Sequence, residues 1–274
     1  QPLPSFSKEI IMGLFSKTKT VDIFFVGSEG TDLDRGIYAF YFNVDNGEII
    51  KKTFVKSLAS PLALNKQGRF MYLTYRNGTG RVQDGGIWQY ACMETQLGLA
   101  ARVGNEGRTY VQTVLNKDSS YAYAIDYYNG EVVSVPIKTS KIIKVSKTVK
   151  LDGHSIDPIK QTESHPTFMT FTPDNTKLVV TDLGGDEVIF FNEGEKGELT
   201  KDEELSFKLT PGSGPLKLVY SKNRKFAYIL NQISSTITCY SVKHNKFTLV
   251  DEVMTYSKDE YDGVNTPMDM VITE

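Results

Sequence analysis

The chain has 274 residues, of which 40% are hydrophobic and 23% charged, a composition typical of a folded globular protein rather than a disordered one. Its 31 basic and 33 acidic residues nearly cancel, so no positive excess attracts a phosphate backbone and nucleic acid is not an expected partner. No window approaches the ~20 apolar residues that span a bilayer, so no membrane association is expected.

Residues 1–20 are predicted to be an N-terminal extension or a docking strand, in front of a domain that covers 21–274. The apolar run at 10–15 is too short for the core of a signal peptide, and no basic segment precedes it. Cys92 and Cys239 lie far apart in strand-like stretches, where small buried hydrophobic residues are a simpler interpretation than a disulfide. These features favour a cytoplasmic protein.

An internal repeat is the main feature of the sequence. A turn followed by an apolar strand recurs, with copies that end at positions 75, 126, 182 and 231. A repeat of roughly 40 to 50 residues is typical of propeller blades or of a solenoid. The spacing predicts equivalent strands at residues 72–75, 123–126, 179–182 and 228–231.

Each copy is followed by a short polar or glycine-rich gap and a second strand, and Gly36–Phe40 is that second strand one repeat earlier. In three units the turn is also preceded by an apolar stretch that begins at Pro61, Pro166 or Pro215. Strands separated by turn residues, with no helical period between them, indicate a meander. Such small sheets must stack and close into a ring, so we predict an all-β chain, a β-propeller.

After the fifth unit, residues 266–273 repeat the strand that opens a blade. The prediction is therefore about five blades plus the first strand of a sixth. Either the propeller is truncated, or its strands are completed by the N-terminal segment or by another chain. An unfinished blade exposes strand edges and apolar surface, so self-association through an open blade edge is expected.

The repeat units resemble the seven-bladed lactonase propellers, a family that includes 6-phosphogluconolactonase and the fungal carboxymuconate lactonizing enzyme. The resemblance runs from about residue 22 to the end, and Pro-Gly-Ser-Gly-Pro is its most specific part. It implies a reaction site at the central mouth of the ring, where a histidine acts as acid or base and arginine and glutamate surround an anionic lactone. The matching stretches are Phe25–Ser28, Gly36–Phe40, Ser60–Leu64, Asp182–Asp186, Pro211–Pro215 and Asn231–Thr236.

The resemblance weakens at the positions that carry chemistry. Where the family has Pro-His-x-His, the chain keeps the first histidine as His165 and replaces the second by Thr167. Leu216 stands for the arginine of the family's Gly-Pro-Arg-His, Lys217 follows it, and Gln232 stands for a glutamate. Leucine cannot bind an anion in bidentate fashion, and glutamine cannot transfer a proton as glutamate does.

Three candidate residues have alternative interpretations. His165 adjoins the long insertion at 150–163 and is either catalytic or a loop histidine that caps a turn. Asp182, at a strand end, either accepts hydrogen bonds from turn N–H groups or lines the channel. Lys217 supplies part of the missing positive charge, unless strand alternation points it away from the side of Leu216. No histidine pair has metal-ligand spacing and no CxxC occurs, so neither a metal nor a cofactor is expected.

Three functions remain open. The first is a lactonase-like hydrolase of a sugar or organic-acid lactone with a degenerate site. The second is a non-catalytic propeller that binds a small molecule or a protein partner, and the third is muconate-type cyclase or isomerase chemistry. By family position, His165 is the catalytic candidate, and the substrate-binding candidates are Thr167, Asp182, Leu216, Lys217 and Gln232. Because three family positions are substituted, 6-phosphogluconolactone is expected to be hydrolysed poorly or not at all.

Overall fold

The computed structural model describes residues 21–28, 36–57, 61–79, 82–93, 96–257, 259 and 261–273. Within these residues the chain forms β-strands arranged in five sheets, and its single helical element is a short 3-10 turn, η1 (Glu195–Gly197). The all-β prediction is therefore confirmed. The predicted N-terminal extension, residues 1–20, lies outside the described residues.

The first two sheets are simple antiparallel meanders. The first contains three strands in the order β1 (Val21–Ser28), β2 (Gly36–Asn43) and β3 (Ile49–Ser57). The second contains four strands in the order β4 (Pro61–Gln67), β5 (Phe70–Thr79), β6 (Val82–Met93) and β7 (Gln96–Glu106).

The other three sheets repeat the four-stranded pattern, and two of them have an outer strand broken into two pieces. The third sheet contains β8 (Tyr110–Leu115), β9 (Tyr121–Asp126), β10 (Glu131–Lys138), β11 (Lys141–Ile142) and β12 (Lys147–Lys150). The fourth contains β13 (Pro166–Phe171), β14 (Lys177–Asp182), β15 (Glu187–Glu193), β16 (Leu199–Lys201) and β17 (Phe207–Lys208). The fifth contains β18 (Pro215–Tyr220), β19 (Phe226–Asn231), β20 (Thr236–Lys243) and β21 (Lys246–Met254).

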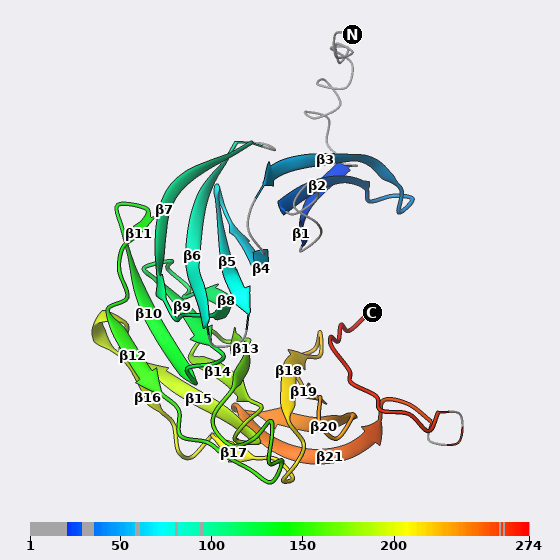
Figure 1. Ribbon diagram of the computed structural model, residues 1–274. Helices are drawn as coiled ribbons and strands as arrows, with labels where there is room; N and C mark the ends of the chain where they lie inside the picture. Colours follow the sequence, from blue (N-terminus) through cyan, green and yellow to red (C-terminus); the bar gives the residue numbers. More distant parts are fainter. Residues whose placement is uncertain are drawn as a thin grey trace.

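The sheets follow one another around an axis as the blades of a propeller (Figure 1). In each four-stranded blade the first strand lies nearest the axis, and the arc is open between the first sheet and the segment after β21. The predicted equivalent segments all fall on the second strand of a blade, namely β5, β9, β14 and β19, which confirms the repeat.

Burial between neighbouring blades explains the apolar runs in the second strands. In β9 and in β14, five consecutive residues are buried, because each blade is covered on both faces by its neighbours. Burying one valine, leucine or isoleucine side chain completely stabilises the fold by roughly 1.5–3 kcal/mol. Each pair of neighbouring blades shares an apolar cluster, with Ile37 packed with Met71, Tyr72 with Ala122, Ile125 with Leu178, and Val188 with Leu218.

Residues 266–273 are not the strand that the sequence predicts for the opening of a sixth blade. They have no regular secondary structure, because a strand requires hydrogen bonds to a neighbouring strand and no described strand pairs with them. They nevertheless contact the fifth blade, since Asp269 pairs with Lys217 and Met268 Sδ lies 3.6 Å from Gln232 Nε2.

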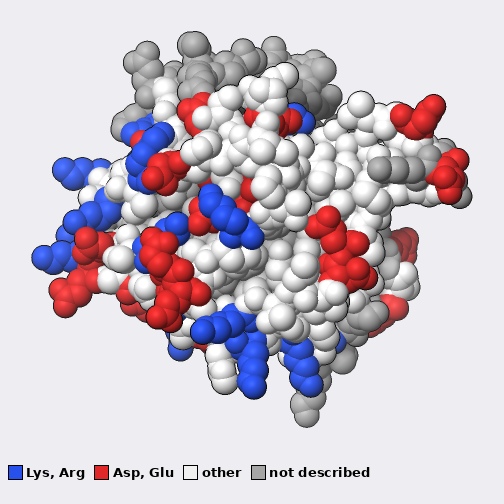
Figure 2. All heavy atoms as spheres, turned by 90° about the horizontal axis from the view of Figure 1, so that it is seen from below, with Lys and Arg blue, Asp and Glu red and all other residues white. Residues whose placement is uncertain are grey.

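The surface carries charges of both signs. Figure 2 shows lysine, arginine and acidic side chains in small groups on the face seen from below. The absence of a nucleic-acid partner stays a prediction. In the part of the chain that the structure describes, no helix has the length and apolar character needed to cross a membrane. Cys92 and Cys239 are partly buried, and no disulfide joins them.

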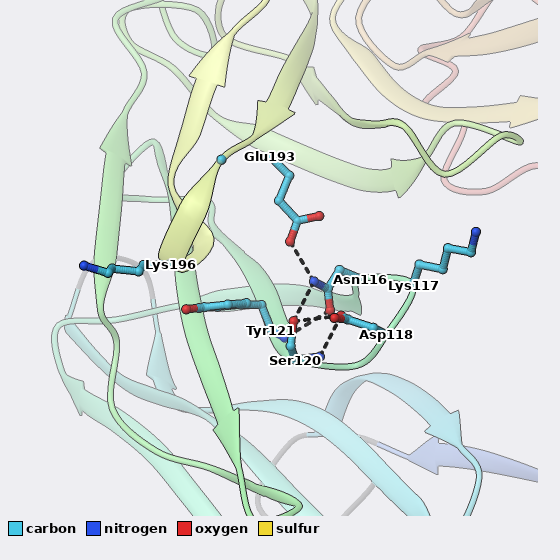
Figure 3. Close-up of a pocket in the computed structure, with 8 residues that line it drawn as sticks. Asn116, Lys117, Asp118, Ser120, Tyr121, Glu193 and Lys196 are labelled. Carbon is cyan, nitrogen blue, oxygen red and sulfur yellow. Dashed lines mark hydrogen bonds between the residues drawn. The ribbon is translucent and has the colours of Figure 1, made fainter.

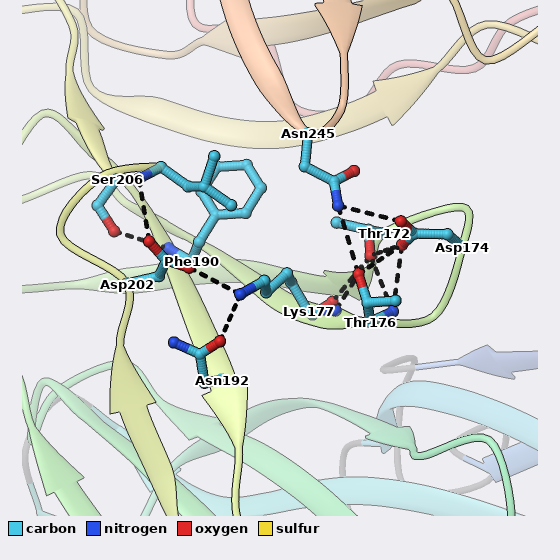
Figure 4. Close-up of polar contacts among 10 residues, drawn as sticks. Thr172, Asp174, Thr176, Lys177, Phe190, Asn192, Asp202, Ser206 and Asn245 are labelled. Carbon is cyan, nitrogen blue, oxygen red and sulfur yellow. Dashed lines mark hydrogen bonds and ion pairs between the residues drawn. The ribbon is translucent and has the colours of Figure 1, made fainter.

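Polar latches join the blades at the turns between their first and second strands. In the turn before β9, Asn116 Nδ2 donates to Oε1 of Glu193 in the next blade over 2.6 Å (Figure 3). The same oxygen accepts a hydrogen bond from Tyr123 Oη in β9 over 2.7 Å. At the turn before β14 the roles are reversed, because Asn245 Nδ2 of the following blade donates to Asp174 Oδ2 over 3.1 Å (Figure 4). The latch therefore recurs between successive blades with different residues.

The second latch gives a pH-dependent prediction. Although partial burial opposes the shift, hydrogen bonds from Thr172, Thr176 and Asn245 lower the pKa of Asp174 to about 2. A carboxyl group with a lowered pKa stabilises the folded state above its unfolded pKa, and that contribution is lost as the pH falls toward about 2. Asn245→Gly removes one donor and keeps the left-handed backbone, with φ of 59°, so the Asp174 pKa should rise toward its ordinary value.

A carboxyl-carbon NMR titration measures this effect directly. Asp118 is the internal control, because its lowered pKa results from Ser120 in its own turn and does not involve a neighbouring blade. An unchanged Asp174 titration in the Asn245→Gly variant, or an equal shift at Asp118, would contradict the latch.

Candidate functional site

The end of the blades at which the inner strands begin is called the mouth here. Each inner strand opens with a β-bulge, where one residue is skipped by the pairing with the second strand. A bulge redirects a side chain and is common beside active sites. The skipped residues are Leu62, Val111, Thr167 and Leu216. Two of the sequence candidates, Thr167 and Leu216, therefore occupy equivalent positions in neighbouring blades.

His165 immediately precedes β13 and is held by main chain and ring. Its N–H donates to Asp182 Oδ1 over 2.7 Å, and its carbonyl accepts a bond of 3.0 Å from the N–H of Leu183. Its Nδ1 lies 3.0 Å from the carbonyl oxygen of Tyr127, and its ring stacks on the Tyr127 ring. Within the described part of the chain, Nε2 makes no hydrogen bond.

Asp182 is completely buried, and both of its oxygens are used within the mouth loops. Oδ1 accepts the N–H groups of His165 and Gly184, and Oδ2 accepts the Ser164 hydroxyl at 2.8 Å. Burial raises the pKa of Asp182, although the bonds from Ser164 and His165 act in the opposite direction. These contacts match the turn-binding interpretation of this aspartate. Both carboxylate oxygens of Asp182 are thus engaged by the protein itself.

Thr167 joins two blades through its side chain. Its Oγ1 donates to the carbonyl oxygen of Pro215, 2.9 Å away in the next inner strand, and lies 3.0 Å from Thr181 Oγ1. Leu216, the equivalent bulge residue one blade later, is half-buried and offers no polar group. A hydroxyl and an isobutyl group thus stand at the bulges where the family resemblance implies histidine and arginine.

Lys217 follows the bulge of β18 and does not present a free charge. Its Nζ pairs with Asp269 and lies 5.8 Å from the centre of the Phe168 ring. Gln232 follows β19, and its N–H donates to the carbonyl of Gly214 over 2.7 Å. In the third blade Tyr127 makes the equivalent bond, to Thr109 over 3.2 Å, so Gln232 and Tyr127 occupy equivalent turn positions.

Sequence reasoning missed an arginine at the mouth. Arg108, two residues before β8, pairs through Nη1 with Glu131 and lies 3.5 Å from Asp126 Oδ2. Its position is equivalent to that of Ser164, because Thr109 and His165 donate their N–H groups to corresponding aspartates. The signal was hidden because the inner strand β8 begins at Tyr110, whereas the other inner strands begin at proline.

The Pro-Gly-Ser-Gly-Pro stretch is a structural clamp. The N–H groups of Gly212 and Gly214 donate to the two carboxylate oxygens of Asp186, each over 2.6 Å. Gly214 has φ of 63°, and a Cβ atom there would lie 2.5 Å from Ile233. The motif therefore fixes the turn before β15 to the start of β18, which explains its specificity in structural terms.

One pocket lies at the opposite end of the blades, around the latch in Figure 3. It has a volume of about 700 Å³ and is lined by the turn before β9 and the end of β15. Its amide, hydroxyl and carboxylate groups bind one another, with Asn116 donating to Glu193 and Ser120 donating to Asp118. We interpret it as a joint between blades. Among the described residues, no group of three or more His, Cys, Asp or Glu side chains is placed to hold a metal ion.

Radial four-stranded meanders, with bulged inner strands that begin at one mouth, define a β-propeller with a buried histidine, His165, at the start of one inner strand. The model of the seven-bladed β-propeller lactonase family matches residues 23–274, and the chain belongs to this family.

Three known proteins show the extent of the similarity. A 6-phosphogluconolactonase of Formosa agariphila is 23% identical over 82% of this chain and 65% of its own length. The crystal structure of a putative 6-phosphogluconolactonase from Bacteroides fragilis has a TM-score of 0.74 at 23% identity, covering 88% of this chain and 70% of that one. The periplasmic gluconolactonase of Pseudomonas aeruginosa has a TM-score of 0.71 at 18% identity, covering 86% and 69%. The chain thus spans about two thirds of these proteins.

Proposed function

We propose that the protein hydrolyses an unphosphorylated sugar or organic-acid lactone, with His165 as the base. One observation carries the proposal. The Nδ1 atom of His165 faces a carbonyl oxygen at 3.0 Å, so it holds a proton and leaves Nε2 to accept one. A neutral imidazole with this orientation is suited to general base catalysis near neutral pH.

The reaction then follows ordinary ester hydrolysis. His165 Nε2 takes a proton from a water molecule while the water oxygen bonds to the lactone carbonyl carbon. The bond between that carbon and the ring oxygen breaks next, and the imidazolium returns the proton to the ring oxygen. The product is the open hydroxy acid, and the histidine is neutral again.

The charges at the mouth support an unphosphorylated substrate. Arg108 is engaged by Glu131 and Asp126, and Lys217 is engaged by Asp269, so both cations already have carboxylate partners. Leu216 adds no charge where the family resemblance implies an arginine. A phosphate dianion would have to displace these pairs, whereas sugar hydroxyl groups require only neutral hydrogen-bond partners.

The known relatives support a lactone as the substrate class. Proteins described as 6-phosphogluconolactonase and as gluconolactonase share the fold at 18–23% identity. Identity at this level does not transfer the substrate. Cytoplasmic location also stays a prediction, since the Pseudomonas aeruginosa structure is described as periplasmic.

The test compares two lactones with the purified protein in a pH-stat. Glucono-lactone should open faster than in a buffer blank, and 6-phosphoglucono-lactone should open at the rate of the blank. The variant Leu216→Arg should improve hydrolysis of the phosphorylated lactone about tenfold or more relative to the other, because a charge-assisted hydrogen bond contributes roughly 1.5–3 kcal/mol. Thr167 is left unchanged because its hydroxyl joins two blades.

The matched control is Leu249→Arg, which adds the same charge at an exposed position of β21 away from the mouth. It should leave the preference between the two lactones unchanged. Equal hydrolysis of both lactones by the unmodified protein, or no response to Leu216→Arg, would contradict the proposed site.

A second candidate function is binding without turnover. The observation that favours it is the use of the Thr167 hydroxyl in a blade contact, which leaves His165 without a second polar group from that strand. Binding of a lactone or its acid to the mouth, without hydrolysis above the blank, would indicate this function. Self-association through an open blade edge also stays a prediction, with which the exposed Leu249, Val250 and Val253 of β21 are compatible.

A further inference from the structure

We propose that Tyr127 is a positioning residue that sets both the tautomer and the ring plane of His165. Its consequence for catalysis rests on the proposed function, but the tautomer itself does not. Tyr127 belongs to the turn after β9 in the third blade, whereas His165 opens the fourth blade. The base is therefore completed across the joint between two blades.

The main chain of Tyr127 sets the tautomer. Its carbonyl oxygen lies 3.0 Å from His165 Nδ1, and a carbonyl oxygen can only accept, so the neutral ring carries its proton on Nδ1. An unconstrained neutral imidazole in water carries the proton mostly on Nε2. The contact thus reverses the ordinary preference and leaves the Nε2 lone pair free for a proton.

The side chain of Tyr127 sets the plane of the imidazole. The two rings lie nearly parallel, at an interplanar angle of 14° with centroids 4.6 Å apart. Rotation of the imidazole about its bond to Cβ would break this stack and move Nδ1 away from the carbonyl. One residue therefore constrains both the position and the orientation of the ring.

Tyr127 is itself fixed and stays uncharged. Its N–H donates to the carbonyl of Thr109 over 3.2 Å, and its ring packs edge-on against Tyr128 at 5.0 Å. Burial, with the nearby Tyr128 and Asp182, raises the pKa of Tyr127 above its ordinary value. A neutral phenol beside the imidazole adds no negative charge that would favour the imidazolium form.

Imidazole nitrogen NMR of the full chain tests the proposal without any substrate. The chain has three histidines, and His154 and His244 are exposed, so they serve as internal references for the unconstrained tautomer. In the unmodified protein and in Tyr127→Phe, His165 should show the Nδ1-protonated neutral form. In Tyr127→Leu the stack is lost, and the His165 signals should move toward the reference pattern.

Kinetics then connect the ring position to the reaction. Tyr127→Leu should lower kcat by roughly 10- to 10²-fold with little change in KM, because a small misplacement of a catalytic group is costly. Tyr127→Phe retains the ring stack and should keep most of the rate of the unmodified protein. Near-ultraviolet circular dichroism confirms that both variants are folded.

Two results would overturn the inference. The first is an Nε2-protonated His165 in the unmodified protein, which decides the question even where Tyr127→Leu does not fold. The second is a His165 spectrum that is the same in Tyr127→Leu and Tyr127→Phe. By contrast, the expected tautomer together with no lactone turnover would refute the proposed function and leave the positioning role of Tyr127 intact.

Discussion

Replacing His165 with asparagine is expected to lower the rate of lactone hydrolysis by roughly 10²- to 10⁴-fold, which is the range for loss of a proton-transfer group. The asparagine Nδ2 can donate to the carbonyl of Tyr127 in place of His165 Nδ1, and the backbone bond to Asp182 is unaffected. The substitution therefore removes Nε2 while it preserves the contacts that join the two blades. The rate is measured in a pH-stat, and the thermal midpoint is measured alongside it.

The matched control is His244→Asn, at an exposed position in the turn between β20 and β21. Its φ of 50° lies in the left-handed region, which asparagine tolerates. This variant should keep the full rate. A His165→Asn protein that hydrolyses lactone as fast as the unmodified one would place the base elsewhere on the molecule.

The fold could be predicted largely because burial between blades leaves a strong trace in the sequence. A second strand covered on both faces is apolar over most of its length, as in Ala122–Ile125, and this run recurs with a regular spacing. The inner strand β8 was missed because its first residue is Tyr110, and the pattern relied on proline. The segment 266–273 was predicted as a strand because it resembles the opening of a blade. Sequence similarity does not supply a pairing partner, so the strand does not form.

The site was less predictable because its contacts depend on neighbouring blades. Tyr127 and His165 are 38 residues apart, and no local pattern connects a turn residue to the start of the next blade. The role of the Thr167 hydroxyl likewise depends on a bulge and on the carbonyl of Pro215, both of which belong to tertiary structure. Family position placed the candidates Thr167 and Leu216 at equivalent bulges of neighbouring blades, whereas the bonding of each side chain required coordinates.

The loop beside His165 allows a severe test of stability. Gly184→Ala is expected to lower the free energy of unfolding by about 3 kcal/mol or more, at the upper end of the cost of overpacking. A Cβ atom at this position would lie 1.8 Å from the carbonyl oxygen of Glu163 and 2.9 Å from the nitrogen of His165. Both neighbours are backbone atoms, so a side-chain rotation cannot relieve the clash. Urea unfolding monitored by circular dichroism measures the change.

Gly98→Ala is the matched control, because Gly98 lies in β7 and an added Cβ atom would meet nothing within 4 Å. This substitution should change the free energy of unfolding by no more than about 0.5 kcal/mol. If the clash at Gly184 is relieved by movement of residues 163–165, Gly184→Ala should also lose lactone hydrolysis, since His165 would be displaced from Tyr127. Equal stability of the two alanine variants would show that the mouth loop adapts freely, and the fixed placement of His165 would then be wrong.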